Sequence, residues 1–193
     1  MTTNHTVSTE KVWMKHYPPE AQHASPPKMK IYSFLKESNK HRLHDVAIYY
    51  YGTRITVNRL IERIDECANA FDALGVKKGD TVSLLSASTP ESIIALYALN
   101  KIGASVNAID PRMDVKSIAR MIKGSGSEVL IVIEIAYPKV AAIFSDINQR
   151  NIIVQSPSTS LPPIKKFATK LVARERIPYG KNGIISWDTF IKG

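Results

Sequence analysis

Strand-like and helix-like segments alternate through the middle of this chain, and this alternation constrains its fold more than any other feature. The apolar run at residues 82–85 is followed by a helix start, with Ser88 or Thr89 expected as the cap. The next strand-like run lies at residues 104–109. Residues 129–133 are five consecutive apolar residues, which is typical of a central parallel strand covered on both faces. Strand, helix and strand in this order form right-handed crossovers, so we predict an α/β fold with a doubly wound, mostly parallel sheet flanked by helices.

Helical spacing is clearest in the segment just before this alternation. Apolar residues recur at steps of three and four from Leu60 to Leu74, and Gly75 follows where a left-handed helix cap is expected. Cys67 flanks the apolar stripe. We interpret it as a small core residue rather than a nucleophile, since no histidine follows His44 in the chain.

Two further helices and two further strands are predicted towards the C-terminus. One helix is expected to start at Asp114 and to end at Gly124, and another to span residues 136–144. A strand is expected at residues 152–155 and a short one at residues 183–186, followed by a last turn.

The chain divides into three predicted parts. Residues 1–45 form an N-terminal arm, whose first 30 residues are rich in Pro, His, Ser and Thr, with a short helix at its end. Residues 46–155 form the α/β core, and residues 156–193 a linker followed by a basic amphipathic tail.

The net charge of +9 suggests a nucleic-acid partner, but its distribution argues against one. Residues 46–155 carry 12 basic and 11 acidic side chains, so the excess lies in the flanking segments. A nucleic-acid groove requires a basic stripe on the folded surface, preferably with aromatic residues between the charges. We therefore expect no nucleic-acid partner.

The same composition indicates a cytoplasmic protein. A single cysteine excludes an internal disulfide, and no apolar segment resembles a secretory signal. The longest apolar stretches are also far shorter than the ~20 residues that span a bilayer.

Nucleotide-binding chemistry is not evident in the turns that follow the predicted strands. The turns SASTP and DPRMD lack glycine, whereas a phosphate cradle needs backbone amides that only a glycine-rich turn can bring close. Gly124-Ser125-Gly126 precedes a strand and therefore faces the opposite edge of the sheet. Asp110 and Arg112 end a strand at the ligand-binding edge, where a structural turn is favoured over direct ligand contact.

The histidines offer a second candidate site, for zinc. All of them precede residue 45, and they are His5, His16, His23, His41 and His44. His41, His44 and the neighbouring Asp45 could share a helical face, but their spacing matches no standard zinc site. We therefore assign no metal-binding residue.

A basic amphipathic segment at residues 164–176 is the third candidate. It could lie on an anionic membrane surface. We favour the alternative in which its apolar face packs against the core and its lysines are solvated, because a few apolar positions give weak membrane affinity without a second anchor.

Several segments together resemble the AMP-forming acyl-CoA synthetases. In chain order they read WMKHYPPE, STPE, LNKIGASVNAIDPR, GSGSEVLIV and ISWDTFIKG. Ser88 stands where that family often has Asn. The first and last segments, together with SLPPIKKF, are similar to the long-chain fatty-acyl branch rather than to amino-acid adenylation domains.

The resemblance implies an enzyme of which this chain is an N-terminal part. A complete member would use ATP and Mg²⁺ to convert a carboxylate to an acyl-adenylate, and would then transfer the acyl group to coenzyme A. The family's phosphate loop, adenylate-binding motifs and catalytic lysine lie beyond the matched segments. We therefore assign no catalytic, cofactor-binding or metal-binding residue here, and expect the chain alone to be inactive.

The implied partner is the missing C-terminal portion, and apolar surface left uncovered by its absence predicts self-association. Two alternatives stay open at this point. One is a free-standing, non-enzymatic α/β interaction domain, and the other is an amino-acid or aryl-acid adenylating relative.

Overall fold

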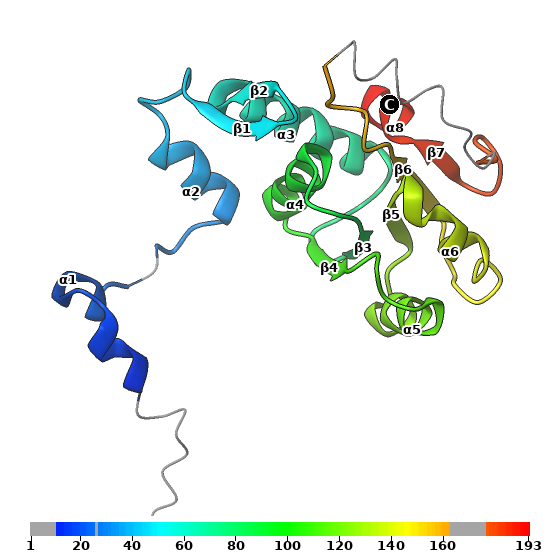
Figure 1. Ribbon diagram of the computed structural model, residues 1–193, viewed down its shortest axis with the longest axis horizontal. Helices are drawn as coiled ribbons and strands as arrows, with labels where there is room; N and C mark the ends of the chain where they lie inside the picture. The colour runs from blue at the N-terminus through cyan, green and yellow to red at the C-terminus, as the bar shows by residue number, and fades with distance from the viewer. Residues whose placement is uncertain (1–10, 26, 163–176) are drawn as a thin grey trace, which may run out of the picture.

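The computed structural model describes residues 11–25, 27–162 and 177–193. Its centre is a five-stranded sheet with the strand order β4-β3-β5-β6-β7, in which every neighbouring pair is parallel (Figure 1). The strands are β3 Thr81–Leu85, β4 Ser105–Ile109, β5 Val129–Ile133, β6 Asn151–Gln155 and β7 Ile184–Ser186. The prediction of a doubly wound parallel sheet is confirmed, with β5 at its centre.

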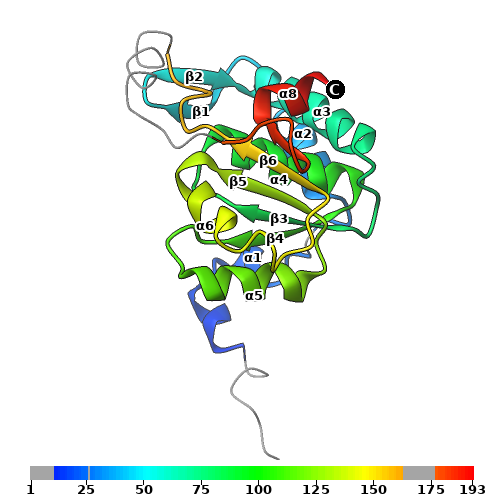
Figure 2. The ribbon, with the colours of Figure 1, turned by 90° about the vertical axis from the view of Figure 1, so that its right-hand side faces the viewer.

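Helices cover both faces of this sheet, and Figure 2 shows α5 on the side opposite α3 and α4. The covering helices are α3 Val57–Ala73, α4 Pro90–Ile102, α5 Val115–Ser125, α6 Tyr137–Ala141 and α8 Trp187–Lys192. Alternate residues of β5 point to opposite faces, so that Val129 and Ile131 join the core under α3, α4 and α8, while Leu130 and Val132 join the core under α5 and α6. All five residues of β5 are buried, which explains its continuous apolar sequence.

Helix α4 begins as the sequence predicts. The side chain of Thr89 accepts a hydrogen bond from the backbone N–H of Ser92, and Pro90 occupies the first turn. The helix is apolar nearly all round because it packs against α2, α3 and β4. Cys67 lies fully buried in the same core, as expected.

Two helix ends differ from the prediction. Helix α5 runs through Gly124 and ends at Ser125, because Gly126, with φ of 64°, is the residue that adopts the left-handed conformation. The predicted helix at residues 136–144 is a 3₁₀ turn, Glu134–Ala136, followed by the short α6. The backbone N–H groups of Ile143 and Phe144 donate to carbonyls three positions back rather than four, so the α-helix does not continue. The predicted last turn is helix α8.

The N-terminal region has two unlike parts. The short helices η2 Val12–His16 and α1 Pro19–Gln22 project away from the sheet (Figure 1). Helix α2 Ile31–Ser38 instead packs on α4, where the backbone N–H of Tyr32 donates to Asn100 (2.9 Å) and its hydroxyl donates to Asp65 (2.5 Å). An antiparallel hairpin of β1 Val46–Tyr50 and β2 Thr53–Thr56 follows.

The proposed domain boundaries at residues 45 and 155 stay a prediction. Strand β7 lies beyond the second boundary and pairs with β6. The basic segment at residues 164–176 lies outside the described residues. Among those that are described, no helix combines the length and the apolar character needed to cross a lipid bilayer.

Candidate functional site

The carboxyl ends of β3, β4 and β5 form the candidate site. Strand β4 lies on one side of β3 and β5 on the other, so the chain changes direction across the sheet between these strands. In open parallel α/β sheets, ligands bind in the crevice that such a reversal leaves at the carboxyl ends. The turns that follow β3 and β4 therefore lie where a ligand would contact this chain.

A pocket of about 630 Å³ lies at this edge. Its apolar wall comprises Leu84, Ile93, Leu96, Ile109 and Ile135. Its polar lining includes Ser86, Ser88, Ser92, Asp110 and Arg112. Ile135, just after β5, is 73% exposed, so an apolar side chain stands in solvent beside the pocket. A pocket with an apolar wall and a few polar groups suits a small molecule that has an apolar body and a polar end.

A buried polar network supports the start of α4 at this edge. Ser86 Oγ donates to Oε1 of Gln155 (3.0 Å), and Ser92 Oγ lies 2.8 Å from Ser86 Oγ and 3.2 Å from the same Gln155 oxygen. Gln155 is 1% exposed. Its Nε2 has no hydrogen-bond partner among the described residues. The amide therefore leaves one buried donor unused next to two serines that line the pocket.

Asp110 and Arg112 bind each other at the mouth of the pocket. The backbone N–H of Arg112 donates to Asp110 Oδ1 (2.8 Å), and the guanidinium donates to Oδ2 (2.6 Å). These hydrogen bonds lower the pKa of Asp110 to about 2. Asp110 thus acts as a turn residue, as the sequence indicates, although both side chains line the pocket.

Among the described residues, neither a histidine nor Cys67 lines this pocket. In the described part of the chain, no group of three or more His, Cys, Asp and Glu side chains is placed to hold a metal ion. His5 lies outside the described residues. Cys67 is fully buried, and burial raises the pKa of its thiol, so it is not available as a thiolate.

The sequence did not identify the network of Ser86, Ser92 and Gln155. A polar residue at the end of an otherwise apolar strand, as in NIIVQ, is a usable signal, because it places an amide at the ligand-binding edge. The sequence around Ser92 indicates only a buried helix, so it gives no sign that this hydroxyl belongs to a polar network.

Known proteins are similar to the part of the chain that contains this pocket. The family model described as AMP-binding enzyme matches residues 35–177. The long-chain-fatty-acid–CoA ligase of Bacillus subtilis (strain 168) is 22% identical over 172 residues, which cover 89% of this chain and 31% of that protein. The 3-hydroxypropionyl-coenzyme A synthetase of Sulfurisphaera tokodaii is 31% identical over 104 residues, which cover 51% of this chain and 16% of that protein. The chain thus spans about a third or less of the length of these curated relatives.

Solved structures show the same fold. A crystal structure of an anthranilate CoA ligase in complex with anthranoyl-AMP superposes with a TM-score of 0.70 at 18% identity, covering 87% of this chain and 29% of that one. A structure described as a putative long-chain-fatty-acid CoA ligase from Rhodopseudomonas palustris CGA009 has a TM-score of 0.66 at 16% identity, covering 84% and 36%.

Proposed function

The chain belongs to the family of AMP-binding enzymes, and from this membership we propose that it is the N-terminal α/β part of an adenylate-forming CoA ligase. The observation that carries the proposal is the family match across residues 35–177, which includes β3 to β6 and the carboxyl-edge pocket. In the proposed reaction, a carboxylate oxygen attacks the α-phosphorus of ATP and pyrophosphate leaves. The thiol of coenzyme A then displaces AMP from the acyl-adenylate, because a carboxylate becomes a good electrophile only when its oxygen is part of a leaving group.

The described residues do not fit ATP or Mg²⁺. The turns after β3 and β4 contain no glycine that would let backbone amides approach a phosphate. The described side chains also present no cluster for a metal ion. We therefore propose that the groups that hold ATP and Mg²⁺, the coenzyme A site and the catalytic residues belong to the part of the longer relatives that this chain does not span.

We propose a long-chain fatty acid as the carboxylate. The B. subtilis long-chain ligase matches 89% of this chain, whereas the S. tokodaii synthetase and the trans-cinnamate:CoA ligase of Petunia hybrida match 51% and 52%. The apolar wall of the carboxyl-edge pocket is compatible with an apolar acid. The competing substrate class is a short or aryl acid, for which those two relatives are the precedent.

The proposed location is the cytoplasm. The single, buried cysteine supports a reducing, cytoplasmic setting.

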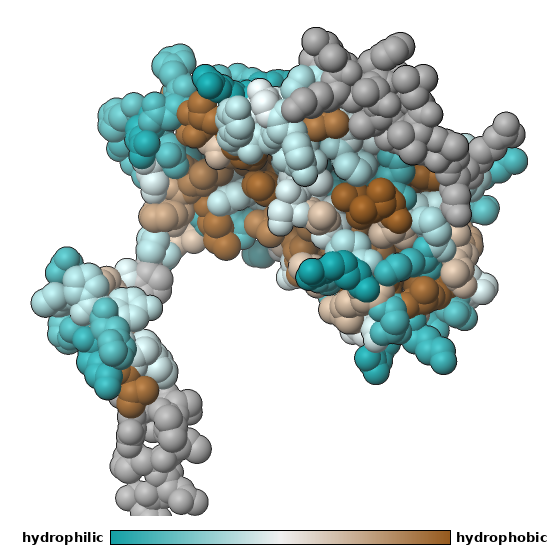
Figure 3. Space-filling view, in the orientation of Figure 1, coloured by the Kyte–Doolittle hydropathy of each residue, from teal (hydrophilic) through white to brown (hydrophobic). Residues whose placement is uncertain are grey.

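The proposed partner is the remainder of a longer polypeptide. Large apolar side chains stand exposed in the described part of the chain, including Tyr49 at 67%, Ile135 at 73% and Leu96 at 39%. Figure 3 shows hydrophobic residues interrupting the hydrophilic surface in several places on one face. If nothing covers this surface, the isolated chain is expected to self-associate, which light scattering would measure.

Sequencing the source DNA beyond codon 193 and expressing the whole reading frame tests the proposal. We expect the complete protein to catalyse carboxylate-dependent ATP–pyrophosphate exchange and acyl-CoA formation, with palmitate exceeding acetate, cinnamate and anthranilate by about tenfold or more in kcat/KM. The 193-residue chain, assayed in parallel, is expected to match the enzyme-free background. Exchange by the isolated chain would contradict the assignment of catalysis to the remainder. A stop codon directly after codon 193 would favour the free-standing interaction domain instead.

A further inference from the structure

A second pocket, of about 300 Å³, lies between α3, α4, α8 and the segment at residues 156–162. Charged residues of all three helices line it, together with apolar residues of α4 and α8. It shares no lining residue with the carboxyl-edge pocket. Its volume is at the lower end of the range for ligand sites, which indicates a small ligand.

The unusual group in this pocket is the carboxyl of Glu91. Although Glu91 lies in the first turn of α4, it is only 1% exposed. Oε1 accepts a hydrogen bond from the hydroxyl of Ser160, whereas Oε2 is buried and has no partner in the described part of the chain. Burial raises the pKa of this carboxyl. A buried carboxyl oxygen without a partner is costly, so a ligand that donates a hydrogen bond to it would relieve that cost.

The guanidinium of Arg63 lies close to the carboxyl of Glu91. Arg63 Nη1 donates to Ser160 Oγ (3.3 Å), so one hydroxyl contacts both Arg63 and Glu91. The opposing charges are therefore close enough for one small molecule to contact both. Lys192 and Asp188, from α8, add one further charge of each sign.

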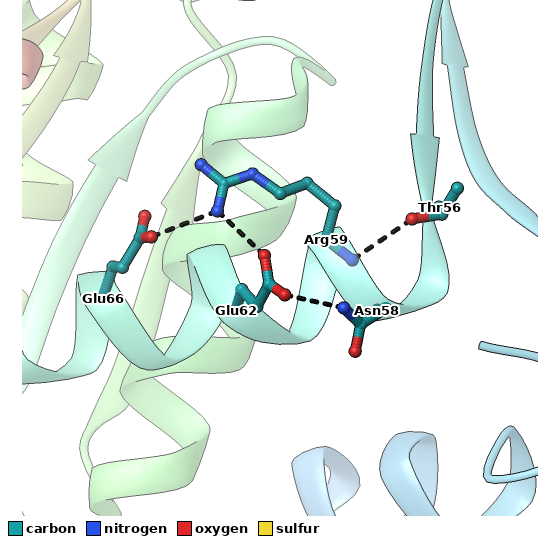
Figure 4. A network of polar contacts seen from close by, with 5 residues as sticks. All are labelled: Thr56, Asn58, Arg59, Glu62 and Glu66. Atoms are coloured by element: carbon teal, nitrogen blue, oxygen red, sulfur yellow. Dashed lines mark hydrogen bonds and ion pairs between the residues drawn. The ribbon is translucent and has the colours of Figure 1, made fainter. Parts of the chain in front are cut away.

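The other charged residues of the pocket are already paired. Arg59 Nη1 donates to Glu62 (3.0 Å) and to Glu66 (3.2 Å) along the exposed side of α3, as Figure 4 shows. Glu66 therefore has a cationic partner on its own helix. What remains for a ligand is the acceptor of Glu91, the guanidinium of Arg63, the charges of α8, and an apolar wall of Ile94, Trp187 and Ile191.

We propose that this pocket binds a small zwitterion of the α-amino acid class. Its ammonium group donates to Oε2 of Glu91, and its carboxylate accepts from Arg63 and Lys192. The ammonium and carboxylate groups of an α-amino acid are bonded to the same carbon atom. This short separation suits Glu91 and Arg63, which both contact the hydroxyl of Ser160. The apolar wall contacts the side chain of the ligand. The proposal is independent of the adenylation reaction, because it needs neither ATP nor coenzyme A.

Calorimetric titration of the full 193-residue chain tests the site. The probes are glycine and leucine, together with N-acetylleucine, which lacks the ammonium, and leucine methyl ester, which lacks the carboxylate. We expect leucine to bind, and each derivative to bind about tenfold or more weakly, since each loses charge-assisted hydrogen bonds. If neither glycine nor leucine binds at ~10 mM, the proposal is wrong.

Variants separate a built site from a non-specific one. Glu91→Gln keeps an acceptor for Ser160 and removes the negative charge, so leucine affinity should fall about tenfold or more. Lys192→Gln, at an exposed position, should weaken leucine without affecting the fold. Glu128→Gln is the matched control, because it removes an exposed carboxylate that lies 3.9 Å from Arg150 and lines neither pocket. Equal leucine affinity in Glu91→Gln, Lys192→Gln and the control would overturn the proposal.

Discussion

The carbonyl oxygen of Arg150 occupies the space in which a side chain at Gly183 would begin. Gly183 also has φ of 71°, in the left-handed region that favours glycine. Its own carbonyl accepts a hydrogen bond from the backbone N–H of Ile152 (2.9 Å). This close backbone approach is what allows β7 to pair with β6 at the edge of the sheet.

Gly183→Ala is therefore expected to lower the free energy of unfolding by about 3 kcal/mol or more, because it adds a backbone clash to a left-handed conformation. Gly180→Ala is the matched control. Gly180 has φ of 81° but open space around its Cβ position, so only the conformational cost of about 1 kcal/mol applies. Urea denaturation of both variants measures the difference. Equal losses would show that the Arg150 carbonyl moves aside.

Glu91→Gln is expected to stabilise the chain at pH 8 and to have little effect near pH 4. Burial raises the pKa of Glu91 above its ordinary value of 4.5, although Arg63 acts in the opposite direction. Between the ordinary and the raised pKa, Glu91 keeps its proton in the folded state and loses it in the unfolded state. The folded state therefore loses stability as pH rises from the ordinary pKa through the raised one. Gln carries no charge and avoids this loss. Thermal unfolding from pH 4 to pH 8 measures the effect, and a constant difference between the proteins would argue against it.

The pKa of Asp110 should report its hydrogen bonds to Arg112. Those hydrogen bonds lower it to about 2, so Asp110 is expected to stay ionised at pH 3. In Arg112→Gln the pKa should return towards the ordinary value of 3.8. NMR titration of the side-chain carboxyl measures both. Any stability that this pair contributes is present above the ordinary pKa and is lost as pH falls through the lowered one.

Cys67 is expected to be inert to a thiol reagent in the native protein. The side chain is fully buried, and burial raises its pKa, so both access and thiolate formation are suppressed. Labelling with a colorimetric disulfide reagent should be slow at pH 8 and fast in denaturing guanidinium. Rapid labelling without denaturant would show that α3 separates readily from the core.

The positions of β3 to β6 and of helices α3 and α4 could be predicted because local apolar patterns encode them. Helix α5 was predicted to end too early. Gly124 and Gly126 both fit a cap by residue type, and only the backbone hydrogen bond from Gly126 to Lys123 decides between them. Such a choice depends on how the next strand enters the sheet, which no local pattern records.

The polar clusters were missed for a different reason. Ser86 and Gln155 are 69 residues apart, as are Glu91 and Ser160, and each pair meets only after the strands have taken their order. Glu91 follows Pro90 in a helix start, where a carboxylate is normally solvated. In the folded chain its carboxyl contacts Ser160, in the segment at residues 156–162, which nothing near Glu91 in the sequence indicates.

Strand β5 contributes Val129 and Ile131 to one core and Leu130, Val132 and Ile133 to the other. Neither helical layer can detach without exposing apolar residues of a strand on which the opposite layer also rests. The two layers are therefore expected to unfold in a single cooperative transition, in which the backbone amide protons of α4 and of α5 exchange with the same free energy of opening.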